Sequence, residues 1–151
     1  MALPEPLEQT LEKLYSALSS GDLATWASMH ADDVAFNVNG STAVSGRTVG
    51  KKAVLDELLP LLFSRVKAES AQIGINWKCM CASGNRATVI FEGISETIEG
   101  RPYNNRYLQM LEFSDDGLIR EVWEFFDTAL AEEVLFLPEQ QPPAGTTSFL
   151  Y

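Results

Sequence analysis

Two glutamates in apolar, strand-like segments are the residues best suited to acid–base chemistry. Glu92 lies within residues 88–94, where most neighbours are apolar, and Glu124 is flanked by Trp123 and Phe125. Burying a carboxylate among such neighbours is costly unless it is paired, hydrogen-bonded or protonated, so its presence indicates a purpose. The structural alternatives are an interface Glu92 bonded to an arginine or an amide, and a solvent-facing Glu124 on an acidic strand.

If Glu92 and Glu124 share a pocket, they cannot both ionise easily. The pKa of one then rises, and the pair can work as acid and base together. One would protonate an epoxide, enol or carbonyl oxygen while the other takes a proton from water or carbon. Asp127 ends the same strand as Glu124, where it either caps a following helix or serves as a third acid–base group.

Side chains near these carboxylates are the candidates for contacting a ligand. Alternation along a strand puts Glu92 on one face with Ile90 and Ile94, and Glu124 with Phe126. The full predicted set of substrate-binding residues is Tyr15, Trp26, Phe36, Leu61, Ile90, Ile94, Asn105, Tyr107 and Phe126. For Tyr15, Trp26 and Leu61, ordinary core packing is the alternative.

Other chemistries find little support in the sequence. There is no glycine-rich phosphate loop and no nucleophilic serine elbow, so we expect neither a nucleotide cofactor nor an acyl-enzyme. Cys79 and Cys81 have no His or further Cys nearby to complete a metal set. His30, the single histidine, is explained by stabilisation of a helix end. We therefore expect no cofactor and no metal.

Charge narrows the range of partners. The net charge is −10, and residues 92–139 carry 12 acidic against 3 basic side chains, so phosphate backbones are repelled and a nucleic-acid partner is not expected. The first residues lack the features of a signal peptide, and no run approaches the roughly 20 apolar residues of a membrane span. A cytoplasmic protein with no membrane association is the expectation.

Helical periodicity dominates the first half of the chain. Leucines at helical spacing predict a helix over residues 5–19, and Asp22 caps a second, short one. Residues 53–62 predict a third helix, which Pro60 should bend or shorten. Between them, Val34, Phe36 and Val38 alternate as in a short strand, and residues 40–50 are predicted to form a loop.

The second half alternates with period two. Residues 73–81, 87–97, 102–113 and 118–127 predict four strands joined by short turns, an antiparallel meander. Helices at the front and a meander at the back predict an α+β fold, with the helices packed on one face of a curved sheet. We expect one domain over residues 1–137 and a surface tail over 138–151. The apolar end of the tail, residues 149–151, would dock on the body or on a partner subunit.

Four local strings, at residues 18–23, 31–34, 100–107 and 116–127, together resemble the nuclear-transport-factor-like superfamily. The resemblance covers about residues 7–137 and includes SnoaL-like polyketide cyclases, limonene epoxide hydrolases and ketosteroid isomerases. It implies a cone-shaped fold with an internal, mostly apolar pocket. Matched to the epoxide hydrolases, the catalytic positions fall on Ile90, Glu92 and Glu124, which keeps two carboxylates and loses an arginine.

Function follows from the resemblance as an expectation. It implies a cofactor-independent enzyme that isomerises, cyclises or hydrates a small apolar, oxygen-bearing molecule, polyketide- or terpenoid-like, with Glu92 and Glu124. The alternative is a non-catalytic ligand-binding or subunit-association domain, because the isomerase positions fall on Leu14, Val38 and Gln109. A homodimer is also implied, in agreement with Val89 and Phe91 needing cover on the face away from the pocket.

Overall fold

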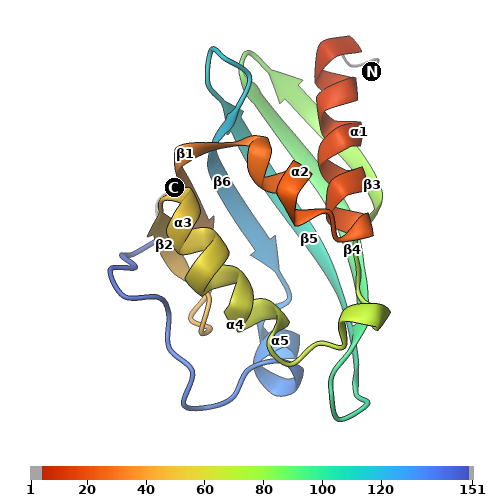
Figure 1. The fold of residues 1–151 in the computed structure, drawn as a ribbon, viewed down its shortest axis with the longest axis vertical. Coiled ribbons are helices and arrows are strands. Elements are labelled where there is room, and N and C mark those ends of the chain that lie inside the picture. Colours follow the sequence, from red (N-terminus) through yellow and green to blue (C-terminus); the bar gives the residue numbers. More distant parts are fainter. Residues whose placement is uncertain (1–4, 150–151) are drawn as a thin grey trace.

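The computed structural model describes residues 5–149, which form a curved six-stranded sheet with helices on one side (Figure 1). The strands run in the spatial order β2-β1-β6-β5-β4-β3. Their bounds are β1 His30–Val38, β2 Gly46–Val49, β3 Gln72–Ser83, β4 Arg86–Glu96, β5 Pro102–Phe113 and β6 Ile119–Phe126. The predicted α+β class is confirmed.

The sheet is mixed, because one of its pairs is parallel. β3 to β6 form the predicted antiparallel meander, but β1 runs parallel to β6 and antiparallel to β2. β2 lies inside residues 40–50, which were predicted as a loop, so that prediction is wrong. The strand is only four residues long and lies between glycines, which hides its alternation.

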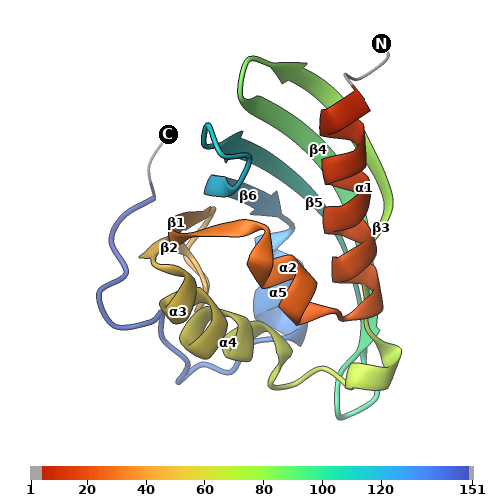
Figure 2. The ribbon, with the colours of Figure 1, turned by 45° about the horizontal axis from the view of Figure 1, so that its top comes forward.

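The concave face of the sheet is covered by helices, as Figure 2 shows. Helix bounds are α1 Glu5–Ser20, α2 Leu23–Ser28, α3 Lys51–Ala53, the π-helical η1 Val54–Leu58, α4 Leu59–Phe63, the 3-10 helix η2 Ala68–Ser70, and α5 Thr128–Val134. Asp22 caps α2 as predicted, since its side chain accepts a hydrogen bond from the Thr25 amide at 3.0 Å. α1 packs on β3 closely: a Cβ on Gly74 would stand 3.1 Å from Leu18 Cδ2.

The helix over residues 51–63 is continuous but contains a π-helical turn at Val54–Leu58, directly before Pro60. Proline has no amide hydrogen to donate, and its ring clashes with the carbonyl four residues earlier. The wider π-helical turn before Pro60 accommodates the proline ring while the helix continues. The predicted shortening of this helix is wrong: the structure shows a locally widened turn within a continuous helix.

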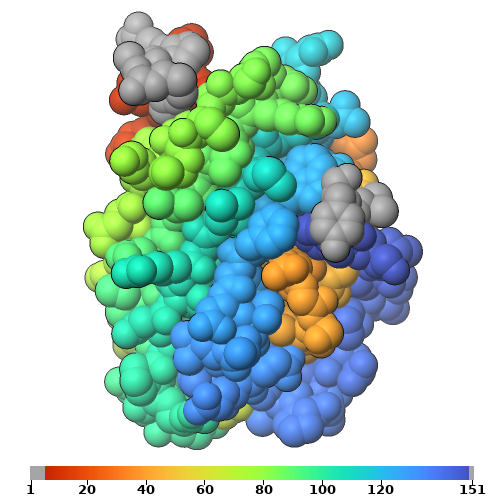
Figure 3. All heavy atoms as spheres, turned by 180° about the vertical axis from the view of Figure 1, so that it is seen from behind, coloured from red at the N-terminus to blue at the C-terminus, as the bar shows by residue number. Residues whose placement is uncertain are grey.

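The two faces of the meander are reversed relative to the prediction. Val89 and Phe91 are 0% and 3% exposed and belong to the core, whereas Ile90 and Ile94 are 38% and 44% exposed. The expectation that Val89 and Phe91 lie on the face away from the pocket is therefore wrong. We call the side of β3–β6 that carries Ile90, Ile94 and Met110 the outer face (Figure 3).

The C-terminal tail lies on the body, beside β1 and β2 (Figure 3). Arg47 and Thr147 exchange backbone hydrogen bonds of 2.8 and 3.1 Å, which adds a short pairing to the edge of β2. The ring of Phe149 meets that of Phe125 edge-on, with centroids 5.6 Å apart. The prediction for the last residues is met at Phe149, while Leu150 and Tyr151 lie outside the described residues. Within residues 5–149, no helix has the length and apolar character needed to cross a bilayer.

Candidate functional site

An internal cavity of about 80 Å³, hereafter the inner cavity, lies between the helices and the concave face of the sheet. Its wall is mostly apolar and comes from both layers. The residues lining it are Leu18, Trp26, Phe36, Val38, Val44, Leu58, Leu59, Leu62, Phe63, Val66, Ile73, Phe91, Ser95, Tyr103, Tyr107, Gln109, Glu124 and Leu135. Glu124 is the one carboxylate among them.

Glu124 is the end of a chain of three hydrogen-bonded side chains. β5 and β6 pair Gln109 directly opposite Glu124, and the Gln109 amide donates to Glu124 Oε2. The Gln109 carbonyl oxygen in turn accepts a hydrogen bond from the Tyr15 hydroxyl at 2.9 Å. Tyr15 and Gln109 are both buried, so this chain fixes the position of the carboxylate.

The environment of Glu124 raises its pKa from 4.5 to about 7. Burial is the cause, because a carboxylate loses hydration in an apolar cavity, and the Gln109 hydrogen bond opposes the shift only in part. A carboxyl group with a pKa near neutrality can both take up and release a proton under physiological conditions. Glu124 is therefore equipped for proton transfer.

Three tyrosines surround this carboxyl group. Burial raises the pKa of Tyr15, Tyr103 and Tyr107, and the negative charge of Glu124 raises each further. Their hydroxyl groups consequently stay protonated and serve as hydrogen-bond donors. Tyr107 packs flat against Phe91, with ring centroids 4.9 Å apart.

Glu92 lies on the outer face, outside the inner cavity. It stands opposite Arg106, whose Nε is 3.3 Å from Glu92 Oε1, and it accepts a hydrogen bond of 2.8 Å from Asn76. These contacts, the Asn76 hydrogen bond first, lower the pKa of Glu92. The expected convergence of Glu92 and Glu124 is wrong, because the β4–β5 register places Glu92 across from Arg106, on the side opposite to Tyr107.

Asp127 also points away from the inner cavity. Its carboxylate accepts a hydrogen bond of 3.0 Å from the Leu130 amide and caps α5. The capping interpretation is thus confirmed, and the residue is exposed.

The other predicted ligand contacts divide into three groups. Trp26, Phe36 and Tyr107 line the inner cavity. Tyr15 reaches Glu124 through Gln109, Asn105 is buried behind Tyr103, and Phe126 packs against the Tyr107 ring at 5.7 Å. Leu61, Ile90 and Ile94 do not line it: Leu58, Leu59 and Leu62 take the helical positions, and the two isoleucines are on the outer face.

The predicted set of substrate-binding residues omitted two polar residues of β5. Tyr103 and Gln109 both line the inner cavity. They share the odd-numbered face of β5 with Asn105 and Tyr107, so strand alternation was the signal that could have added them.

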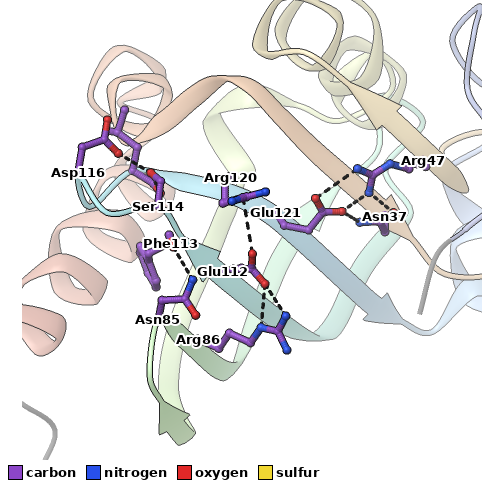
Figure 4. Close-up of polar contacts among 11 residues, drawn as sticks. Asn37, Arg47, Asn85, Arg86, Glu112, Phe113, Ser114, Asp116, Arg120 and Glu121 are labelled. Atoms are coloured by element: carbon purple, nitrogen blue, oxygen red, sulfur yellow. Dashed lines mark hydrogen bonds and ion pairs between the residues drawn. The ribbon is translucent and has the colours of Figure 1, made fainter.

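A separate polar cluster holds β1, β2 and β6 together away from the inner cavity (Figure 4). Arg47 pairs with Glu121 and donates to Asn37 Oδ1 at 3.0 Å, and Asn37, which is 0% exposed, donates to Glu121 Oε1 at 2.6 Å. Because each member bonds to the other two, this cluster is explained by structure alone.

Comparisons with known proteins agree with the architecture. Residues 11–122 match the family model described as the SnoaL-like domain. No curated protein matches the chain.

Three similar solved structures each share less than a quarter of the sequence of this chain. An NTF2-like protein from Burkholderia pseudomallei is 18% identical with a TM-score of 0.73, covering 86% of this chain and 97% of that chain. A proposed polyketide cyclase from Pseudomonas putida is 17% identical with a TM-score of 0.66, covering 83% and 95%. TerC, crystallised with polyporic acid, is 18% identical with a TM-score of 0.69, covering 87% and 98%. At these identities the likeness establishes the NTF2-like fold.

Proposed function

Since this chain belongs to the SnoaL-like domain family, as its sequence predicted, we propose that it is an acid–base enzyme acting on a small apolar, oxygen-bearing molecule. The reaction class is isomerisation, cyclisation or addition of water, and Glu124 carries the proton. One observation supports this most: a half-buried carboxyl group with a pKa of about 7 faces a mostly apolar cavity.

The chemistry needs one group that can accept and return a proton. Ionised Glu124 takes a proton from a carbon next to a carbonyl group, and the electron pair of the C–H bond moves onto the carbonyl oxygen as an enolate. Protonated Glu124 then returns that proton to a different carbon. In a cyclisation, the enolate carbon attacks a second carbonyl within the molecule, and the proton goes to the alkoxide oxygen that this attack creates. Gln109 keeps the carboxylate in place, and the apolar wall excludes bulk water.

The substrate class is narrowed by the wall of the inner cavity. Aromatic and aliphatic side chains favour a polyketide- or terpenoid-like molecule, and a similar solved protein carries the name of a proposed polyketide cyclase. A volume of about 80 Å³ is below the roughly 300–1,000 Å³ of most ligand sites, so a larger substrate requires some of the lining side chains to move outward.

Two isosteric variants test the role of Glu124. Glu124→Gln removes the proton carrier, and we expect turnover of a cyclisable or enolisable substrate to fall by about 10²-fold or more. Glu92→Gln is the matched control, because it makes the same change on the outer face, and its turnover should stay near that of the unaltered protein. Equal, near-normal rates in both folded variants would contradict the proposal.

The alternative is a non-catalytic domain that binds an apolar ligand. The small volume of the inner cavity and the internal hydrogen bonding of Glu124 favour it. Binding of apolar ligands with no product formed across a broad panel of ketones, enols and epoxides would select this alternative.

We further propose a homodimer formed through the outer face. Ile90, Ile94, Met80 and Met110 are each at least 37% exposed there, and a second copy would cover them. Glu92 and Arg106 stand in the same area, so a twofold arrangement can set opposite charges against each other. Sedimentation at micromolar concentration tests the proposal: Ile90→Asp should shift a dimer to a monomer, and a monomeric unaltered protein would contradict it.

A further inference from the structure

The side chains of Tyr103 and Tyr107 both line the wall of the inner cavity. Both side chains extend from β5 toward the concave face. The Tyr107 ring lies over Gly93, where a Cβ would stand 3.1 Å from Tyr107 Cε2, so a side chain at this position would displace the ring. The ring also stacks on Phe91, so two neighbours on β4 restrict its position.

The amide of Asn105 decides what the Tyr103 oxygen can do. Asn105 Oδ1 accepts hydrogen bonds from two backbone amides, Arg106 at 2.8 Å and Asp127 at 3.1 Å, which fixes the orientation of the amide group. Asn105 Nδ2 must then be a donor, and it donates to the Tyr103 hydroxyl at 3.0 Å and to the Asp127 carbonyl at 3.1 Å. The Tyr103 oxygen is therefore an acceptor in this contact.

A count of the hydroxyl protons of Tyr103 and Tyr107 leaves one of them without an acceptor. The two tyrosines have two hydroxyl protons, and a contact between their hydroxyls could take up only one of them. Asn105 supplies its own proton to Tyr103, so it takes none. Among residues 5–149 no acceptor is found for the second hydroxyl proton. That proton is available for donation to an acceptor that a ligand brings into the inner cavity.

We propose that the Tyr103–Tyr107 pair binds an acceptor oxygen of the ligand, which makes ketones and their enols the substrate class of the inner cavity. This inference rests on the proposed function, because it assumes that the inner cavity is the ligand site. Glu124 lines the same cavity as both tyrosines, so the bound oxygen and the proton carrier would share one small space. An enolate formed by proton removal would accept a stronger hydrogen bond than the ketone, as catalysis requires.

A pair of probes with the same shape tests the inference without needing turnover. Cyclohexanone and methylenecyclohexane differ only in an oxygen replaced by a CH₂ group. Binding is measured at pH 8.5, above the pKa of Glu124 at about 7, where this carboxyl group is ionised and cannot donate. In Tyr103→Phe/Tyr107→Phe, the ratio of ketone to alkene affinity should fall about 5- to 10-fold, the effect of one lost hydrogen bond.

The control is Tyr15→Phe, which removes a hydroxyl whose proton is already donated to Gln109, so the affinity ratio should be unchanged. A second measurement uses the unaltered protein: the ¹³C resonance of labelled cyclohexanone should move downfield on binding, as for a hydrogen-bonded carbonyl. An unchanged ratio in the double variant, or no downfield shift in the unaltered protein, would overturn the inference.

Glu124→Gln separates the two proposals. The tyrosine pair is intact in this variant, so the downfield shift should persist while turnover is lost. If turnover persists but the shift depends on the tyrosines, the proposed proton carrier is wrong and the tyrosine site stands. If turnover is lost and the shift is independent of the tyrosines, the reverse holds.

Discussion

Gln109 on β5 and Glu124 on β6 are direct neighbours across the sheet, and the amide donates a hydrogen bond to the carboxylate. Gln109 receives the Tyr15 hydroxyl on its other side, so the amide cannot turn without breaking two bonds. A carboxyl group held in this way has a defined position, but its ionised form is less stable than in water, because its pKa is raised from 4.5 to about 7. Two predictions follow from that combination.

The first concerns stability at alkaline pH. The folded pKa of Glu124, about 7, exceeds the unfolded value of 4.5, so the unfolded state binds fewer protons between these values and stability falls as pH rises. Removing this dependence in Glu124→Gln should raise the free energy of unfolding at pH 8 by about 2 kcal/mol, a figure reduced from the full linkage value because the residue is only half-buried.

Urea unfolding at pH 4 and pH 8 measures the effect, which should be present only at the higher pH. Glu92→Gln is the control and should change stability in the opposite direction, because the contacts of Glu92 lower its pKa. No stability difference between Glu124→Gln and the unaltered protein at pH 8 would contradict a raised pKa.

The second prediction concerns the pH dependence of the rate. If ionised Glu124 abstracts the proton, kcat/KM for a substrate without ionisable groups should rise about tenfold per pH unit below the pKa of about 7, then level off. If protonated Glu124 acts first, the profile is reversed. Steady-state kinetics from pH 5 to 9 distinguishes the two, and a flat profile between pH 6 and 8 would exclude both.

The third prediction concerns His30, which is 2% exposed and packs its ring against Trp26 at a centroid distance of 4.0 Å. Burial lowers its pKa from 6.5 to about 4, and Lys51 adds to the shift. The unfolded state therefore binds more protons between these values, so stability falls by about 3 kcal/mol as pH drops from 6.5 to 4.

Over pH 4.5–6.5 the contributions of His30 and Glu124 oppose each other and should nearly cancel. His30→Asn should consequently make stability fall with rising pH, whereas Glu124→Gln should make it rise. The ring resonances of His30 offer a direct measurement, since they should not titrate above about pH 5. A titration midpoint near 6.5 in the folded protein would contradict the prediction.

The fourth prediction compares two ion pairs of different burial. The side chains of Arg47 and Glu121 are 21% and 15% exposed and share Asn37, whereas those of Lys52 and Asp56 are 90% and 54% exposed. Arg47→Met leaves Glu121 without its charged partner and should cost about 2–3 kcal/mol of unfolding free energy. Lys52→Met should cost less than about 0.5 kcal/mol. Chemical denaturation measures both losses of unfolding free energy. Similar losses would show that the Arg47–Glu121–Asn37 cluster contributes no more to stability than the exposed Lys52–Asp56 pair.

Local patterns were enough to predict most of the elements. The helix over α1, the Asp22 cap, the four meander strands and the α5 cap at Asp127 depend on neighbours in sequence, and all were predicted. The parallel pairing of β1 with β6 was not predicted, because it joins segments about 90 residues apart and has no local signal.

The sequence also did not show which face of β4 points toward the core. Alternation groups Ile90, Glu92 and Ile94 correctly, but both faces of β4 are apolar, so composition does not tell inside from outside. The deciding information is the register with β5, which the connection over residues 97–101 sets and which puts Glu92 opposite Arg106. In β3, positive φ angles at Gly74 and Asn76 interrupt the predicted alternation.

The pairing of Thr147 with Arg47 bears on how the molecule behaves at high concentration. An unpaired outer strand is a template for addition of another chain and for fibril growth. The tail occupies part of that template at β2, and at the opposite border β3 has register shifts and exposed Lys78, which hinder strand addition. Both borders of the sheet are thus protected against aggregation, one by the chain's own C-terminal segment and the other by irregular backbone and charge.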